Sequence, residues 1–313
     1  MILQLGSIIL QNYENIFIKF AEKKYKTMKH IIARFIFILI AFNFVGAFAD
    51  AAVRYHCPED SVRALDLIAA AQKGETYAQR VVSAARALTG IPAGPAADND
   101  MAGTIVLRLD TLNQREFINM ALAAAKASMH SNPGLREFEE ALEEVSRKKG
   151  KDTGFDSQFL YGSDWIVDNV YRGNIKEMTD YIDGGSFRTK TLDYVSRHKD
   201  EFPALADSAV FEKIKVMEMG YRSHRIPHQK KQSINSKAIK EMVEEGDIIV
   251  MLIPDSDFDV YDIGIVAENN GQHHLIHLSK AEGKIVEDPY PLSRLFKIEG
   301  QFFYGYRWLR PQE

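Results

Sequence analysis

The chain has 313 residues, of which 46% are hydrophobic and 26% charged, and a formal net charge of -4 at pH 7. This composition is typical of a globular protein, and the absence of a basic excess argues against nucleic acid as a partner. The single cysteine, Cys57, excludes an internal disulfide, so stability must come from a hydrophobic core.

The first segment with a recognisable pattern is a predicted signal peptide at residues 28–49. Basic residues open it, an apolar run of about a dozen residues follows, and Ala47-Phe48-Ala49 has the small-x-small pattern of a cleavage site. The run is too short for a permanent transmembrane helix. We therefore expect residues 1–27 to be an over-extended start and the mature protein to be exported, either periplasmic or secreted. The alternative is an N-terminal membrane anchor that uses both apolar patches.

The first half of the mature chain is predicted to be mainly helical. Hydrophobic periodicity and capping signals predict helices at these positions: two within 58–90 (the first capped by Asp60 or Ser61), then 113–129, about 134–147, 189–200 and 208–222. Alternating β-branched residues predict a short strand at 104–109. The segment 161–175 is expected to be irregular or a short helix, and the basic run 224–231 a loop that faces solvent.

The C-terminal third changes to a strand pattern. Apolar and alternating runs predict strands at 247–253, 259–268, 273–279, 284–287 and 301–309, with helices at 236–245 and in the PLSRLF segment. Asn269-Asn270-Gly271 is a strong hairpin turn signal. Helices that feed an antiparallel sheet define an α+β fold. We expect a helical segment at 50–103 followed by one domain at 104–313.

Several stretches occur in an order that resembles a known family. They are GDIIVMLI from Gly246, DVYDIGIV from Asp259, HHLIHLSKAEGKIV from His273 and a terminal YGYRWLRP, with SDW at 163–165 in the middle of the chain. Together they resemble the exported N-acetylmuramoyl-L-alanine amidase-like family, which belongs to the NlpC-type, papain-like peptidoglycan cysteine hydrolases. The resemblance covers about residues 75–310 and implies a papain-like fold and a role at the cell wall.

The resemblance also marks a candidate site in which two catalytic residues are replaced. In the family a cysteine begins a helix, where the helix dipole stabilises its thiolate, a strand histidine is its base, and a third polar residue orients the ring. The Asp-Cys pair aligns with Asn113-Gln114, the base aligns with Asp262, and the third residue is kept as His277. The resemblance further implies substrate contacts from Asn113, Tyr261, Ser163, Asp164 and Trp165.

Two functional hypotheses follow, and whether the chain is an enzyme stays open between them. The first is a catalytically degenerate homologue that binds a muropeptide or a protein partner through the inherited cleft. The second is an active amidase or peptidoglycan endopeptidase that uses a non-standard site made of Asp262 and His277. Neither hypothesis requires a cofactor, nucleic acid or a permanent membrane span after signal cleavage.

Weaker patterns suggest other sites. His56 beside Cys57 suggests a nucleophile, but adjacent side chains do not face each other in a helix or strand. Asp255, Asp257 and Asp259 resemble the start of a calcium loop but lack its later ligands, so a solvated acidic loop is favoured. The histidines at 273, 274 and 277 would need further ligands to bind zinc. The basic run 224–231 remains a candidate for contact with an anionic glycan.

Overall fold

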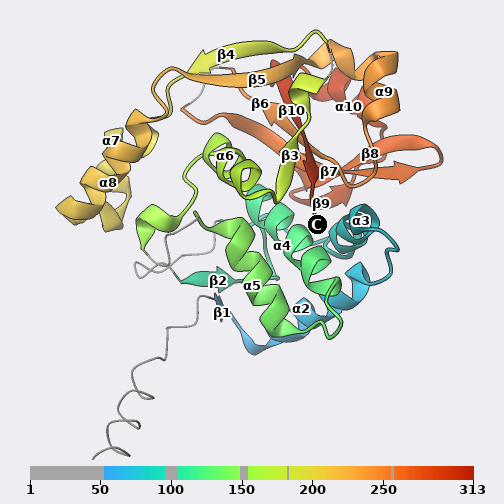
Figure 1. Ribbon diagram of the computed structural model, residues 1–313, viewed down its shortest axis with the longest axis horizontal. Coiled ribbons are helices and arrows are strands. Elements are labelled where there is room, and N and C mark those ends of the chain that lie inside the picture. The colour runs from blue at the N-terminus through green and yellow to red at the C-terminus, as the bar shows by residue number, and fades with distance from the viewer. Residues whose placement is uncertain (1–52, 96–103, 149–153, 182, 255–256) are drawn as a thin grey trace, which may run out of the picture. The chain divides into compact units, whose positions relative to one another are not determined.

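A computed structural model describes residues 53–95, 104–148, 154–181, 183–254 and 257–313 (Figure 1). The predicted over-extended start, signal peptide and cleavage site lie outside these residues. None of the helices in the described ranges has the length and apolarity needed to cross a membrane. The described chain belongs to one compact unit that begins at Ala52.

The first half is helical, as predicted. Its helices are α2 (Pro58–Ala71), α3 (Tyr77–Ala87), α4 (Gln114–Ser128), α5 (Leu135–Ser146) and α6 (Gly162–Arg172), and two short strands, β1 (Val53–Tyr55) and β2 (Ile105–Leu107), pair in parallel. The cap of α2 is Cys57 rather than the predicted Asp60 or Ser61, because Pro58 occupies the first helical position.

Helix α4 is the central helix of this half because alanines fill its middle and let neighbouring helices approach. Most of its residues are buried, and it packs against α2, α3 and α5. Asn113 caps it: Asn113 Oδ1 accepts from Arg115 N at 3.0 Å and Glu116 N at 2.9 Å, and Glu116 Oε2 accepts from Asn113 N at 2.9 Å. This reciprocal capping box fixes the first turn of the helix and the direction of the Gln114 side chain.

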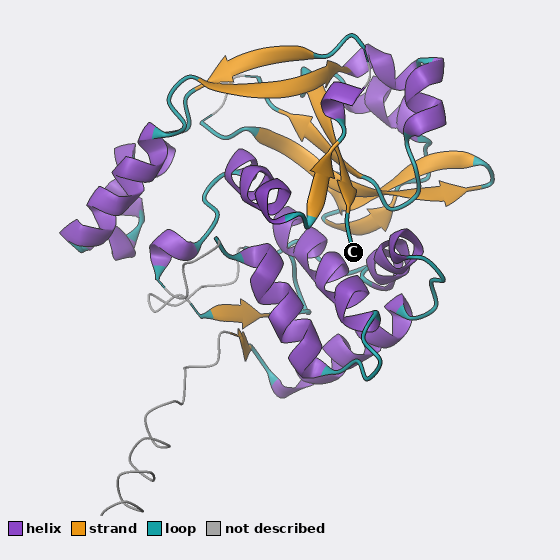
Figure 2. Cartoon of the chain, viewed as in Figure 1, coloured by secondary structure: helices purple, strands orange, loops and turns teal. Residues whose placement is uncertain are grey.

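The C-terminal half forms an antiparallel sheet, also as predicted (Figure 2). Its strands are β3 (Ile175–Glu177), β4 (Ser186–Lys190), β5 (His224–Lys230), β6 (Ile248–Leu252), β7 (Val260–Asn269), β8 (Gln272–Ser279), β9 (Lys284–Glu287) and β10 (Gly305–Pro311). Their order is β4-β5-β10-β6-β7-β8-β9, and β3 also pairs with β10. Asn270 and Gly271 have φ of 52° and 73° in the predicted hairpin turn between β7 and β8.

The strand β6 in the middle of the sheet is buried on both faces. Along β6, Ile248, Val250 and Leu252 join the core formed with α2 to α5, whereas Ile249 and Met251 join a second core. This second core includes residues of α9 (Lys237–Met242) and α10 (Leu292–Glu299), which lie on the opposite side of the sheet in Figure 1. A strand covered on both faces reads as a continuous apolar run, which explains the sequence IIVML.

The segment from α6 up to β6 differs most from the sequence predictions. Residues 161–175 contain the regular helix α6, and the predicted helix at 189–200 is wrong over its first residues, which belong to β4 and a following turn. The helical part is only α7 (Tyr194–Arg197), followed by α8 (Ser208–Met219), and both pack around a third core. The predicted basic loop at 224–231 is strand β5, which pairs with β4 from Ser186↔His228 to Lys190↔His224.

Short 3-10 helices complete the chain at Phe155–Ser157, Thr179–Tyr181, Lys199–Glu201, Pro203–Ala206 and Lys231–Asn235.

Candidate functional site

The structure brings the three predicted catalytic positions together. Gln114 is the first residue of α4, and its Nε2 donates to Asp262 Oδ1 at 2.9 Å. His277 on β8 lies beside Asp262 on β7, with 2.6 Å between His277 Nδ1 and Asp262 Oδ2. The register explains this contact: Gly264 is paired with His277, so Asp262 is its diagonal neighbour. A helix N-terminus therefore faces a strand pair, as the resemblance predicts.

The Asp262 carboxylate has its hydrogen-bonding capacity filled by protein groups. Besides Gln114 and His277, it accepts from Ile263 N at 2.8 Å, and the residue is 3% exposed. The Gln114 amide lies in addition 3.3 Å from the carbonyl oxygen of Tyr261. All three donors belong to the protein itself.

His277 lies between two carboxylates. Its Nε2 is 3.5 Å from Asp288 Oδ2, while its Nδ1 faces Asp262. Burial alone would lower the pKa of His277, but the hydrogen bonds and charges of Asp262 and Asp288 outweigh it and raise the pKa to about 9. The imidazole is therefore protonated at neutral pH, and a protonated ring cannot act as a general base.

We call Gln114, Asp262, His277 and Asp288 the polar row. Asp288 was missed in the sequence because no family motif points to it. The sheet register supplies a signal: Val286 is paired with His277, so residue 288, two positions further on, returns to the same face. The row contains two carboxylates, one imidazolium and one neutral amide. Each side chain contacts the next, from Gln114 through Asp262 and His277 to Asp288.

A cavity of about 620 Å³ lies beside the polar row. The N-terminal residues of α4 and α6, the start of β7 and the end of β8 line it, and Gln114 is the one member of the polar row among its lining residues. Asp262 and His277 do not line it and are 3% and 5% exposed. Asp262 and His277 therefore contribute no surface to the cavity wall, whereas Gln114 does.

The predicted substrate-contact residues divide into two groups. Asn113, Tyr261 and Trp165 line the cavity, although Trp165 is 1% exposed and its indole donates to Asn119 and Val145 in the core. Ser163 and Asp164 do not line the cavity, and both are buried.

Both oxygens of the Asp164 carboxylate contact other side chains of the protein. It forms an ion pair with Lys148 at 2.9 Å and accepts from the Tyr221 hydroxyl at 3.0 Å. The SDW sequence therefore marks the start of α6 and its packing, and of its residues only Trp165 reaches the cavity wall.

The start of α6 is fixed against β7 by an aspartate that the sequence analysis placed in a solvated acidic loop. That interpretation is wrong for Asp259, which is 2% exposed and accepts from the backbone amides of Gly162 and Ser163. A Cβ atom on Gly162 would lie 2.2 Å from Val260 Cγ2, so only glycine allows this approach. The capped start of α6 thereby forms one wall of the cavity.

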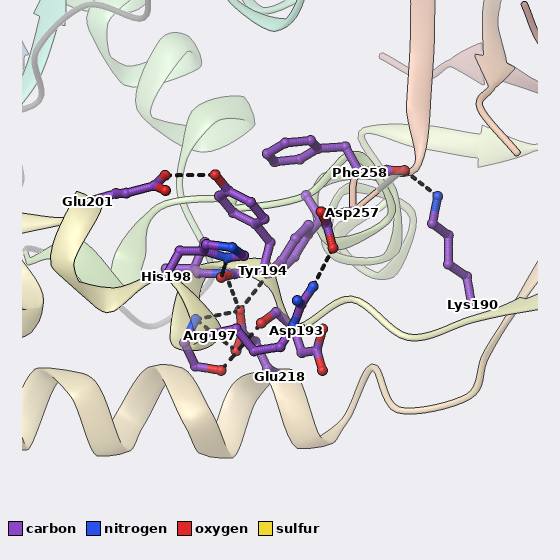
Figure 3. A network of polar contacts seen from close by, with 12 residues as sticks. Lys190, Asp193, Tyr194, Arg197, His198, Glu201, Glu218, Asp257 and Phe258 are labelled. Carbon is purple, nitrogen blue, oxygen red and sulfur yellow. Dashed lines mark hydrogen bonds and ion pairs between the residues drawn. The ribbon is translucent and has the colours of Figure 1, made fainter. Parts of the chain in front are cut away.

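Another part of the wall is Phe258, which the α7 segment holds in place (Figure 3). The ring of Tyr194 lies 4.9 Å from the ring of Phe258, and the Lys190 ammonium donates to the Phe258 carbonyl. Arg197 forms an ion pair with Asp257, the residue before Phe258. The α7 segment, which packs around the third core, thus supports the cavity wall through one aromatic contact and two exposed polar contacts.

The other suggested sites lie elsewhere or gain no geometric support. Cys57 caps α2, where its thiol donates to Asp60 at 3.2 Å, and it does not line the cavity. Within the described ranges, no group of three or more His, Cys, Asp or Glu residues is arranged to hold a metal ion.

An α+β domain in which a capped helix N-terminus meets an antiparallel strand pair beside a cavity has the architecture of a cell-wall amidase-like protein. The family model described as AmiA-like, N-acetylmuramoyl-L-alanine amidase-like, matches residues 94–298. The chain belongs to this family. No curated protein matches the chain.

Solved structures share the fold at low sequence identity. An N-acetylmuramoyl-L-alanine amidase from Bacteroides uniformis is 21% identical with a TM-score of 0.66, and the match covers 74% of this chain and 99% of that one. A putative xylanase from Bacteroides fragilis is 24% identical with a TM-score of 0.63, covering 72% and 98%. A Legionella pneumophila protein of the DUF1460 family is 15% identical with a TM-score of 0.63, covering 82% and 95%.

Proposed function

We propose that this chain is a peptidoglycan-binding member of its family that holds a muropeptide in the cavity and does not hydrolyse it. The observation that carries the proposal is the chemistry of the polar row. At the position where the resemblance requires a thiolate, the Gln114 amide donates to Asp262, and where it requires an imidazole base there is a carboxylate.

His277 and Cys57 do not supply the missing base and nucleophile. His277 is protonated between Asp262 and Asp288, and both it and Asp262 are buried away from the cavity. The hydrogen bond from Cys57 to Asp60 raises the pKa of that thiol, whereas a cysteine nucleophile needs a lowered pKa. The alternative of an active site built from Asp262 and His277 therefore lacks a surface in the cavity wall and an unprotonated imidazole.

The cavity itself favours a binding role. A volume of about 620 Å³ lies within the usual range of about 300–1,000 Å³ for small-molecule sites. Its wall combines apolar side chains with a few polar groups, which suits a sugar-linked peptide. A protein partner is the competing occupant, and the same binding experiment separates the two.

The test is to measure binding and turnover with one ligand set. Purified protein is titrated with defined muropeptides by calorimetry, and the same mixtures are analysed for cleavage by chromatography. We expect saturable binding with no product, and no effect of Cys57→Ser. Cleavage that disappears in Asp262→Ala and in His277→Ala would establish the alternative, and failure of all muropeptides to bind would leave a protein partner as the occupant.

Export is part of the same proposal. Its support is the predicted signal peptide at 28–49 and the membership of a cell-wall family. Mass spectrometry of the mature protein is expected to give an N-terminus at Asp50. A mature protein that keeps residues 1–27 would overturn both the cleavage site and the predicted start at Met28.

A further inference from the structure

The charges that line the cavity are unbalanced. Arg115 and Lys280 are its lining cations, and Asp259 is the one carboxylate among the lining residues. Asp259 already accepts from the backbone amides at the start of α6, so its negative charge interacts with the N-terminus of that helix. The charges of Asp262 and Glu299 act on Lys280, but no ion pair of Lys280 with a carboxylate is found in the described part of the chain. Lys280 is therefore a cation of the cavity wall without a direct ion-pair partner among the described residues.

Lys280 is held in a defined position at the end of β8. Its Nζ donates to the carbonyl oxygen of Tyr261 at 2.9 Å and lies 3.2 Å from the centroid of the Tyr261 ring. Tyr261 is itself fixed, because its hydroxyl donates to Glu299 at 2.8 Å. An ammonium has three donors, and the carbonyl uses one of them. The cation–π contact and this hydrogen bond orient the ammonium before any ligand arrives.

The surroundings of Lys280 favour an anion beside it. Although the residue as a whole is exposed, contact with Tyr261 partly buries its ammonium, and this burial lowers the pKa of Lys280. A charged group that has lost part of its hydration gains more from an opposite charge than one in open water.

The geometry also decides between kinds of anion. Phosphate groups are commonly bound by uncapped helix N-termini and backbone amides. Here the N-terminus of α4 is capped by Asn113 and that of α6 by Asp259. Of the two lining cations, Arg115 donates to the carbonyl oxygen of Phe159, and Lys280 is the exposed one. One exposed, oriented ammonium suits one carboxylate on an otherwise uncharged chain.

We propose that Lys280 binds a free carboxylate of the peptide stem of the ligand and makes the cavity selective for acidic muropeptides. This inference rests on the proposed function and adds the ligand group that the site recognises. Lys280 is not a member of the polar row, and the proposal does not require that row to have any catalytic activity.

The test compares one muropeptide in two forms. An N-acetylmuramoyl tetrapeptide with free carboxylates and the same compound with its carboxylates amidated are titrated by calorimetry. Loss of a charge-assisted hydrogen bond is expected to weaken binding by about tenfold to a hundredfold, so the wild-type protein should prefer the free acid by that factor. Lys280→Met, which keeps the length of the side chain, should bind both forms equally weakly, and Lys280→Arg should keep most of the preference.

The matched control is Lys297→Met, which removes an exposed lysine of α10 that does not line the cavity. It should leave the preference unchanged. Equal affinity of the wild-type protein for both forms, with no effect of Lys280→Met, would overturn the carboxylate site and leave the proposed function standing. A wild-type protein that binds neither form would remove both. Circular dichroism of each variant excludes unfolding as the cause of a lost signal.

Discussion

The polar row and the cavity beside it both contain charged side chains, but the neighbours of those side chains differ. In the row, the charges of Asp262 and Asp288 are met by His277 and the amide of Gln114, all within the protein. In the cavity, the Lys280 ammonium contacts a carbonyl and a ring, and its nearby charges, Asp262 and Glu299, form no ion pair with it among the described residues. A cation of the cavity wall without a direct ion-pair partner is available to a ligand.

This difference separates two roles that one active site would normally combine. A hydrolase needs its reactive groups exposed to the bound substrate and poised between protonation states. Asp262 and His277 are buried and the raised pKa of His277 keeps its ring protonated at neutral pH, while the cavity is accessible. Under the proposed function, the cavity wall holds the ligand and the polar row has a structural role, and the following changes test that division.

The largest expected effect comes from restoring the residues that the family resemblance implies. In a Cys57→Ser background, Gln114→Cys with Asp262→His places a thiol at the start of α4 and an imidazole within reach of it. The helix N-terminus lowers the thiol pKa below the free value of about 8.5, and general-base activation typically contributes about 10²–10⁴-fold in rate. Alkylation by iodoacetamide as a function of pH measures both effects, and slow muropeptide cleavage is then expected.

Gln114→Cys alone, in the same background, is the control for that variant. It should alkylate more slowly than the double variant because Asp262 repels a thiolate and cannot serve as an imidazole base. If the folded double variant alkylates no faster than a free thiol, the two positions are not a catalytic pair, and the homology of this site to the family's site is lost.

The second prediction concerns the structural role of the row. Asp262→Ala removes the main partner of the His277 imidazolium and leaves the Gln114 amide without its acceptor. Breaking a buried ion pair typically costs about 3–5 kcal/mol, so the free energy of unfolding measured in urea should fall by about this amount. Asp257→Ala, which removes an exposed partner of Arg197, should cost about 0–1 kcal/mol. Similar losses in the two variants would refute a structural role for the row.

The third prediction follows from the pKa of His277, which is raised from 6.5 to about 9 in the folded protein. The folded state holds this proton more tightly than the unfolded state, so its contribution to stability is complete below pH 6.5 and is lost as the pH rises through 9. The loss amounts to about 3 kcal/mol at most. Urea unfolding of the wild-type protein at several pH values should show this decline, and His277→Gln should flatten it.

The sequence predicted the elements whose patterns are long and local. Helix α4 and strands β6 to β8 lie within a residue or two of their predicted bounds because their apolar periodicity extends over many residues. The ribbon of β4 and β5 was missed because its sequences, SFRTK and HRIPHQK, are short and rich in basic residues. Those strands are stabilised by pairing with each other across a long stretch of chain, which no local pattern reveals.

The candidate site shows the same limit. Gln114, Asp262 and His277 could be placed only through the family resemblance, and the structure brings them together. Asp288 and Lys280 lie just after strands, where their partners depend on sheet register and on the loop that returns to the cavity. A sequence gives the residue types at such positions but not the neighbours that the fold supplies.

The smallest expected effect tests how far the cavity depends on its outer support. Arg197 and Asp257 form an exposed ion pair, so Arg197→Ala should lower the free energy of unfolding by less than about 1 kcal/mol. Lys237→Ala, which removes a more exposed ion pair on α9 away from the cavity, should also lower the free energy of unfolding by less than about 1 kcal/mol and serves as the control. The two variants should differ in binding. Asp257 precedes the cavity residue Phe258, whose contact with Tyr194 is an aromatic pair worth about 0.5–1.5 kcal/mol. Loosening that wall should weaken muropeptide binding by a factor of a few in Arg197→Ala and leave it unchanged in Lys237→Ala. Calorimetry that finds the same affinity in both variants would show that the cavity holds its shape without the α7 segment.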